Sequence, residues 1–103
     1  MSEDLEKYRT EIIEINRQIL RLLKIRLQTA EKIGQIKKRQ NLPVTNLKVE
    51  ADTINRARKL VREIDLDEVF ALQLINMLIA ESIKVQAGIE HIDNPVRLFN
   101  HCH

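Results

Sequence analysis

The sequence predicts an all-α fold with three helices per chain, one very long and two shorter, in an intertwined homodimeric helical bundle. The first observation is compositional: only three aromatic residues, two glycines and two prolines occur among 103 residues, while isoleucine and leucine are abundant. The second is the spacing of apolar residues in alternating steps of three and four, the period of an α-helix. Both observations argue against an all-β or a Rossmann-type fold.

The first helix is expected to run from Leu5 to Arg39 or Gln40, because no proline precedes Pro43. A helix of about 36 residues is about 54 Å long, whereas a compact chain of about 100 residues has a radius of gyration of about 13 Å. One chain cannot cover such a helix, so two chains are expected to intertwine, each long helix lying against its mate. The apolar stripe on this helix consists of Leu5, Tyr8, Ile12, Ile15, Ile19 and Leu22.

Two shorter helices are expected to follow a turn in the segment NLPVTN. Asn46 is expected to cap the second helix, which should end near Ile64. Asp65, with Glu68 three residues later, is expected to open the third helix as a capping box, and this helix should end near Ile89. Residues 1–91 are therefore expected to form one helical domain, and residues 92–103 a C-terminal tail.

Charge and cysteine content narrow the class of protein. Seventeen basic and fifteen acidic residues give a net charge of +2, a balance that argues against nucleic acid as a partner. A single cysteine, Cys102, excludes an intrachain disulfide and favours a cytoplasmic location. No apolar run reaches the length of about 18 residues that a membrane span requires, so no membrane association is expected.

The sequence contains no glycine-rich phosphate loop and no nucleophile beside a histidine. Covalent catalysis and metal catalysis are therefore not expected.

Polar residues occupy positions where each helix should be apolar. Continuing the first stripe brings Arg26 and Lys37 into the buried row, on one face and about 16 Å apart along the axis. Glu50 lies in the corresponding row of the second helix, and Ser82 and Gln86 share one side of the third. Burying unpaired charge is expensive, so such groups must be satisfied by one another, by water or by a ligand.

Each of these residues also has a structural explanation. Glu50 could pair with Lys37 or Arg26, and Ser82 could bond back to Leu78 in its own helix. Two cations, an acid, a hydroxyl and an amide converging in one helical core nevertheless suit a small, doubly anionic, oxygen-rich ligand.

The segment from Leu5 to Gln86 resembles the all-helical chorismate mutase family. The resemblance is carried by Tyr8-Arg9 and the helix that continues to Arg26, by IGQIK at 33–37, and by ESIKVQ at 81–86. The family's spacings between its functional positions in the first and third helices match without a gap. The resemblance implies the Claisen rearrangement of chorismate to prephenate in aromatic amino acid biosynthesis, with no cofactor, metal or covalent intermediate.

The resemblance also implies roles for individual residues. Arg26 and Arg9 would clamp the two carboxylates of the substrate, with Arg9 supplied by the partner chain, and Ser82 would help to hold a carboxylate. Arg9 and Arg26 lie about 100° and about 25 Å apart on one straight helix, which supports their coming from different chains. Lys37 and Gln86 would donate hydrogen bonds to the ether oxygen, on which negative charge grows as its bond to carbon breaks.

The start of the second helix departs from the family pattern. Glu50 would accept a hydrogen bond from the ring hydroxyl, but Asn46 and Val49 stand where the family usually has aspartate and arginine. Asn46 can still cap the helix and offer its backbone to the substrate. This departure leaves open an isochorismate pyruvate lyase of the same superfamily. A noncatalytic helical dimerisation or regulatory module, with the inward charges as a structural network, is a further alternative.

Overall fold

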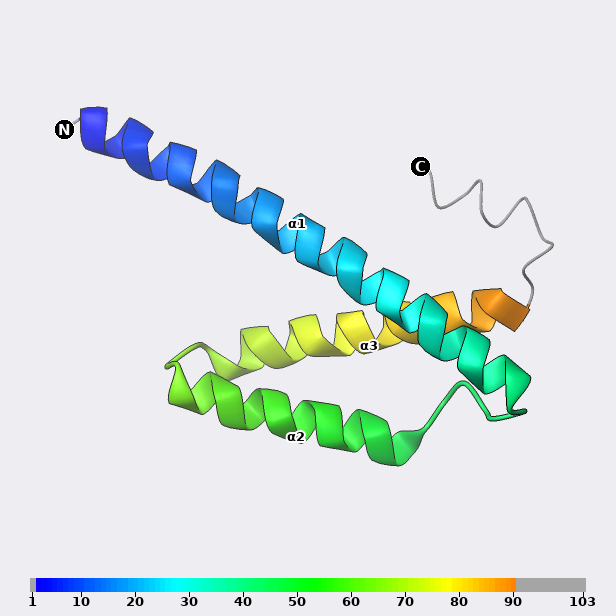
Figure 1. The fold of residues 1–103 in the computed structure, drawn as a ribbon. Coiled ribbons are helices and arrows are strands. Elements are labelled where there is room, and N and C mark those ends of the chain that lie inside the picture. Colours follow the sequence, from blue (N-terminus) through cyan, green and yellow to red (C-terminus); the bar gives the residue numbers. More distant parts are fainter. Residues whose placement is uncertain (1, 91–103) are drawn as a thin grey trace.

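The computed structural model describes residues 2–90, and this part of the chain is all-helical, with three helices and no strand. Helix α1 spans Ser2–Arg39, α2 spans Leu47–Glu63 and α3 spans Glu68–Glu90. The C-terminal half of α1 crosses α3, and α2 lies along α3 (Figure 1). The expected tail at 92–103 lies outside the described residues, and the division of the chain at residue 91 stays a prediction.

Helix α1 ends where the sequence predicts, at a turn in which Asn41 adopts a left-handed conformation with φ of 55°. The N–H of Leu42 donates to the carbonyl of Lys37 at 2.8 Å, and the N–H of Asn41 donates to that of Lys38 at 3.3 Å. These two bonds form a Schellman motif, which satisfies carbonyls that the end of a helix leaves free. Pro43 follows and cannot extend the helix, because it has no N–H to donate.

Helix α2 begins at its predicted cap. Asn46 has an extended backbone, and its side-chain oxygen accepts from the N–H of Val49 at 3.2 Å. The helix ends at Ile64 in a second turn of the same kind, where the N–H of Leu66 donates to the carbonyl of Val61 at 3.0 Å.

The predicted start of the third helix is wrong by two residues. Asp65, expected to form a capping box with Glu68, instead adopts φ of 55° and terminates α2. Asp67 is the cap, and its Oδ2 atom accepts from the N–H of Phe70 at 2.8 Å. The pattern was ambiguous because the short side chain of aspartate suits both an N-cap and the left-handed position that ends a helix.

The two caps give a prediction for stability. Asn46→Ala and Asp67→Ala each remove one side-chain acceptor for a free helix N–H, and each should lower the free energy of unfolding by about 1 kcal/mol. Urea titrations at one fixed protein concentration, followed by helical circular dichroism, measure this change. An unchanged midpoint in either variant would show that its cap contributes nothing to stability.

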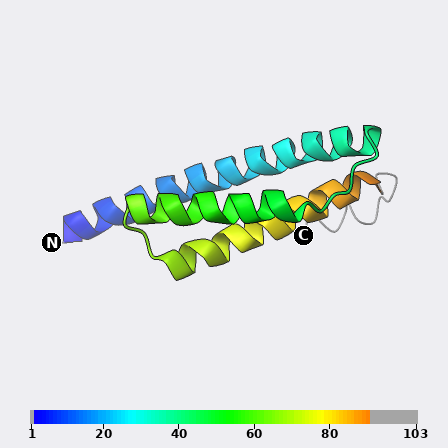
Figure 2. The ribbon, with the colours of Figure 1, turned by 90° about the horizontal axis from the view of Figure 1, so that it is seen from below.

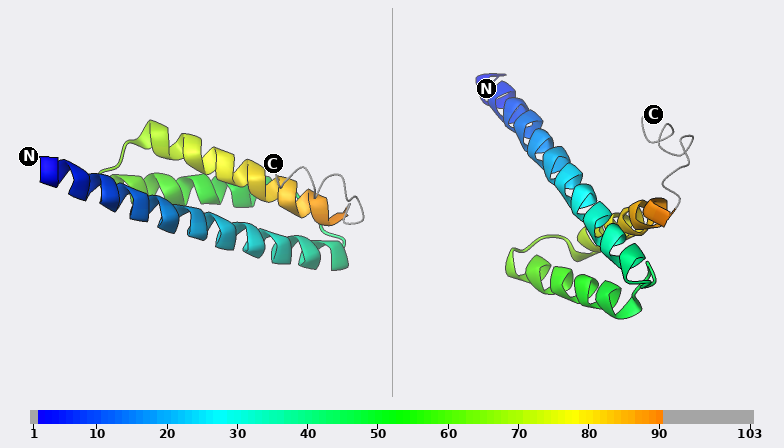
Figure 3. Two further views of the ribbon diagram at one scale, coloured as in Figure 1. Left: turned by 90° about the horizontal axis from the view of Figure 1, so that it is seen from above. Right: turned by 45° about the vertical axis from the view of Figure 1, so that its right-hand side comes forward.

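The N-terminal half of α1 projects away from the other two helices (Figure 1, and Figure 3, right). Seen from below, the three axes run nearly along one direction, with the N-terminal end of α1 extending past α2 (Figure 2). The radius of gyration is 17.4 Å, larger than the value of about 13 Å for a compact chain of this length. The chain is therefore elongated, with extents of 58 × 33 × 17 Å.

One chain buries little of its apolar surface. Within the described residues, the buried apolar side chains are the small or medium-sized Ala30, Val61 and Ala71. The stripe predicted on the first helix is 48% to 64% exposed along its whole length, from Leu5 to Leu22. Leu47 at the start of α2 and Val69 at the start of α3 are also exposed.

Within residues 2–90, no helix combines the length and the apolar character that a membrane span requires.

Candidate active site

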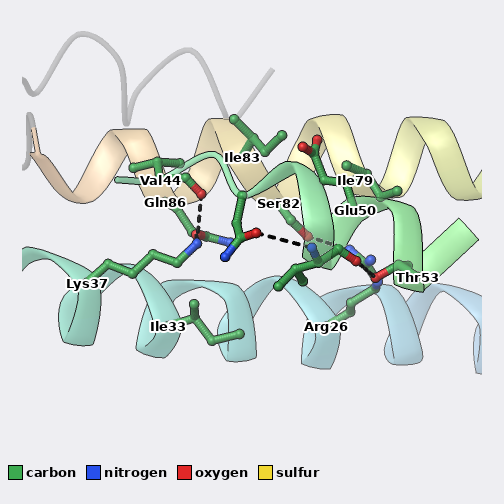
Figure 4. A pocket seen from close by; sticks show the side chains of 12 residues that line it. Arg26, Ile33, Lys37, Val44, Glu50, Thr53, Ile79, Ser82, Ile83 and Gln86 are labelled. Carbon is green, nitrogen blue, oxygen red and sulfur yellow. Dashed lines mark hydrogen bonds between the residues drawn. The ribbon is translucent and has the colours of Figure 1, made fainter. Parts of the chain in front are cut away.

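A cavity of about 190 Å³ lies among the C-terminal half of α1, the start of α2 and the second half of α3. Side chains from all three helices and from the connection between α1 and α2 converge on it (Figure 4). It is lined by Arg26, Ile33, Lys37, Val44, Asn46, Val49, Glu50, Thr53, Ile79, Ser82, Ile83 and Gln86. All candidate site residues of the sequence except Arg9 are thus gathered around one cavity.

Lys37 joins three parts of the chain. Its Nζ atom donates to the backbone carbonyl of Val44 at 2.7 Å and to Oε1 of Gln86 on α3 at 2.8 Å (Figure 4). An ammonium group has three N–H donors and no acceptor. Two donors are therefore taken by neutral carbonyl groups, and the third has no acceptor among the described residues and can donate to a ligand.

The same contact orients the amide of Gln86. Because Lys37 can only donate, the atom of Gln86 that faces it must be the amide oxygen, and the amide nitrogen then points elsewhere with both of its N–H donors. Gln86 is only 7% exposed, so its orientation is held by buried surroundings rather than by bulk water. Lys37 and Gln86 together provide N–H donors at one end of the cavity.

Arg26 is held against α3 at the other end of the cavity (Figure 4). One of its terminal nitrogens donates to the carbonyl of Leu78 at 2.9 Å and to the hydroxyl of Ser82. The hydroxyl proton of Ser82 stays free to donate, because the hydroxyl oxygen accepts the bond from the guanidinium. The sequence also allowed Ser82 to donate to the backbone of Leu78. In the structure, the Ser82 hydroxyl and the Leu78 carbonyl instead both accept from Arg26.

Among the described residues that line the cavity, Glu50 is the only acidic one, and it lies in the first turn of α2, where the helix dipole favours a negative charge. Its Oε2 atom is buried and has no hydrogen-bond partner within the described part of the chain. A buried acceptor without a donor costs about 1–3 kcal/mol, so this atom suits a ligand that brings a donor.

The cavity has an excess of positive charge. Among the side chains that the structure describes, neither Arg26 nor Lys37 forms an ion pair with a carboxylate, and their acceptors are carbonyl, amide and hydroxyl oxygens. The ion pairs that Glu50 might have made with either cation are not formed. Two uncompensated cations facing one cavity favour an anionic ligand.

Arg9 lies outside this cavity, on the projecting half of α1. Its side chain is 64% exposed and pairs with Glu6, one turn earlier, at 3.1 Å. Surface pairs of this kind contribute at most about 1 kcal/mol, so Arg9 is available for another partner.

Two groups at the cavity were not predicted from the sequence. Thr53 lies one turn after Glu50 on α2, and this helical spacing could have identified it. The carbonyl of Val44 left no signal, because a backbone acceptor is carried by every residue and only the turn geometry selects this one.

The chain was compared with known proteins. Residues 8–87 match the family model described as chorismate mutase type II. A chorismate mutase from Methanocaldococcus jannaschii is 30% identical over 86 residues, which cover 84% of this chain and 87% of that protein. A bifunctional chorismate mutase/prephenate dehydratase from Aquifex aeolicus is 37% identical over 62 residues, which cover 60% of this chain and 17% of the larger protein. No solved structure gives a significant match.

The family model covers most of the chain, and its matched range includes every residue that the structure brings to the cavity. The relative from Methanocaldococcus jannaschii matches over nearly its whole length. The chain therefore belongs to the type II chorismate mutase family and is an enzyme of that family.

Proposed function

We propose that this protein converts chorismate to prephenate in a cavity shared between two copies of the chain. The observation that carries the proposal is the single cavity in which Arg26 and Lys37 lie without ion-pair partners beside the unpaired Oε2 atom of Glu50. The substrate is a dicarboxylate with a ring hydroxyl and an ether oxygen. The cavity offers complementary groups to the hydroxyl, the ether oxygen and one carboxylate, and Arg9 of a second copy is assigned to the other carboxylate.

Lys37 and Gln86 act on the ether oxygen. In the rearrangement one carbon–oxygen bond breaks as one carbon–carbon bond forms within the same molecule, and negative charge develops on the oxygen. The third N–H of Lys37 and the amide N–H groups of Gln86 donate to that oxygen. Donors already fixed in position stabilise the developing charge without having to reorganise during the reaction.

Glu50 and the start of α2 bind the ring hydroxyl. The unpaired Oε2 atom of Glu50 accepts the hydroxyl proton in a hydrogen bond, which removes the cost of a buried acceptor without a donor. The Oδ1 atom of Asn46 accepts from Val49 in the helix cap, and its backbone carbonyl accepts from the N–H of Glu50 at 3.0 Å, which fixes the position of Glu50. Asn46 therefore contributes to the substrate site through its backbone N–H.

Two arginines bind the substrate carboxylates. Arg26, steadied by Ser82 and the carbonyl of Leu78, binds one of them. Arg9 of the partner subunit binds the other. Arg9 and Arg26 of one straight helix lie about 25 Å apart, too far to meet on one small molecule. Holding both carboxylates restrains the substrate in the compact, chair-like form that the rearrangement requires.

An intertwined dimer would cover the exposed apolar surface of α1. Burial of apolar area contributes about 25 cal/mol per Å², and the stripe from Leu5 to Leu22 is a long row of half-exposed side chains. A largely apolar groove of about 210 Å³ lies between α1 and α3 and shares Arg26 with the cavity. It is lined by Leu23, Arg26, Leu27, Leu74, Met77, Leu78 and Glu81. Both surfaces support the seating of a second α1 across this side of the molecule.

The dimer gives a prediction for the α1 stripe. Ile12→Asp should convert the dimer to monomers, because the dimer would have to bury an unpaired carboxylate. Gln28→Asp, about 160° around the same helix, is the matched control and should remain dimeric. Sedimentation equilibrium at equal concentrations distinguishes the two states. Unchanged mass in Ile12→Asp, or monomers in the unmodified protein, would contradict the proposed interface.

The function is tested by incubating the purified protein with chorismate and identifying the product by chromatography, then repeating the assay with isochorismate. Prephenate from chorismate is the expected result. Pyruvate and salicylate from isochorismate alone would identify a lyase instead. No turnover of either substrate by a folded dimer would leave the noncatalytic module as the function. The cytoplasmic location inferred from the cysteine content stays a prediction.

A further inference from the structure

Lys37 is tied twice to the connection between α1 and α2, residues 40–46, which we call the α1–α2 loop. Its backbone carbonyl accepts from the N–H of Leu42 at 2.8 Å, and its side-chain Nζ donates to the carbonyl of Val44 at 2.7 Å. The main chain and the side chain of one residue therefore hold two points of the same loop.

The conformation of this loop is restricted at several points. Asn41 is held at φ of 55° by the Schellman turn, and Asn46 is fixed as the cap of α2. Between them, the ring of Pro43 locks φ near −65° and restricts the backbone of Leu42 before it. The carbonyl of Val44 comes one residue after Pro43, so these restrictions narrow the range of positions that it can take.

A hydrogen-bond acceptor in a fixed position orders a lysine side chain more than it orders most other donors, because the lysine side chain is long and flexible. The ammonium of Lys37 ends a flexible stem with four rotatable bonds, and ordering such a side chain costs entropy at the moment of reaction unless it is already ordered. Gln86 supplies one acceptor from α3, and Val44 supplies the second from the loop. With both acceptors in place, the direction of the third N–H is fixed.

We propose that the α1–α2 loop is a positioning element for the reaction, in which Pro43 holds the carbonyl of Val44 and that carbonyl aims Lys37 into the cavity. The inference rests on the proposed function, because it concerns the step in which Lys37 donates to the ether oxygen. Pro43 itself does not line the cavity, so it acts only through the loop. It is a positioning residue that the substrate does not reach.

The test compares Pro43→Gly with Asp65→Gly. The first substitution frees φ in the α1–α2 loop, whereas the second puts glycine at the left-handed position of the α2–α3 turn, away from Lys37. Pro43→Gly should lower kcat by about tenfold with KM within about twofold, because a misaimed donor weakens the transition state more than the ground state. Asp65→Gly should keep both constants. A kcat within twofold of the unmodified protein for Pro43→Gly would overturn the proposal.

A second readout links the effect to Lys37. In lysine-labelled protein, the exchange of the Lys37 ammonium protons with water can be followed by nitrogen-15 NMR, with Lys37→Arg identifying the signal. Exchange should be at least about tenfold faster in Pro43→Gly than in the unmodified protein or in Asp65→Gly, because one acceptor is released. A loss of kcat with unchanged exchange would show that Pro43 does not act through Lys37, and would overturn the proposal.

Folding and function are separated within the same experiment. Circular dichroism and the melting temperature report whether Pro43→Gly is folded. If it is not, Pro43→Ala frees the same φ with less added chain entropy and carries the same two expectations. If the proposed function fails, the unmodified protein gives no turnover, whereas the exchange measurement still shows whether the loop orders Lys37.

Discussion

Lys37→Ala is expected to lower kcat/KM for chorismate by about a thousandfold, since removal of one preorganised donor to a developing oxyanion costs about 10²–10³ in rate. The upper end of that range applies because the substitution also removes the contact that orients Gln86. The variant should keep the helical content and the molecular mass of the unmodified protein, because the lost contacts are two hydrogen bonds at the cavity rather than apolar packing. Progress curves of chorismate consumption measure the change.

Lys32→Ala is the matched control for this substitution. Lys32 is an exposed lysine on the same helix, outside the residues that line the cavity, and its removal should leave kcat/KM within about twofold. A Lys37→Ala protein that retains a tenth or more of the unmodified activity would contradict the role assigned to its ammonium group.

Gln86→Glu is expected to make activity depend on pH. The substitution keeps the size of the side chain, but the new carboxyl lies beside the ammonium of Lys37, which favours its ionised form. An ionised carboxylate only accepts hydrogen bonds, and its negative charge opposes the charge that grows on the ether oxygen. At pH 8 we expect kcat/KM to fall by about 10²–10³.

The activity of Gln86→Glu should increase as the pH falls, because the ether oxygen needs a hydrogen-bond donor at this position. As the pH falls, the new carboxyl takes up a proton and regains an O–H that can donate, so kcat/KM of the variant should rise toward acidic pH. The unmodified amide needs no protonation, and its activity should extend across neutral and basic pH. Gln73→Glu, an exposed position on α3, is the matched control and should behave like the unmodified protein. A flat profile for Gln86→Glu would contradict the assigned donor role.

The helices and most of the cavity were predictable from the sequence because both depend on periodicity. The spacing of eleven residues between Arg26 and Lys37 brings them to nearly one face of an unbroken helix, and both line the cavity. Ser82 and Gln86 are one turn apart on α3, so their common direction follows from the same geometry. Asn46 could be recognised as a cap because asparagine is among the residues preferred immediately before the first turn of a helix.

The remaining features depend on contacts that carry no periodic signal. Asp65 occupies the left-handed position of the turn that ends α2, and Asp67 caps α3. Because both residues are aspartates, the sequence does not show which of them takes which position. The acceptor role of Val44 depends on a backbone carbonyl that any residue would supply. The pairing of Arg26 with Ser82, in place of Glu50, depends on how α1 crosses α3, which side-chain spacing within one helix does not determine.

We propose that Arg9 of the partner subunit completes each cavity, and mixing two inactive variants tests this shared site. Arg9→Ala and Arg26→Ala should each keep less than about a hundredth of the unmodified rate. After joint unfolding and refolding at equal concentrations, about half of the dimers contain one chain of each kind, and one of their two cavities then has both arginines. We predict recovery of about one quarter of the unmodified rate. No recovery in mixtures shown to contain mixed dimers, or full activity of Arg9→Ala alone, would contradict a shared site.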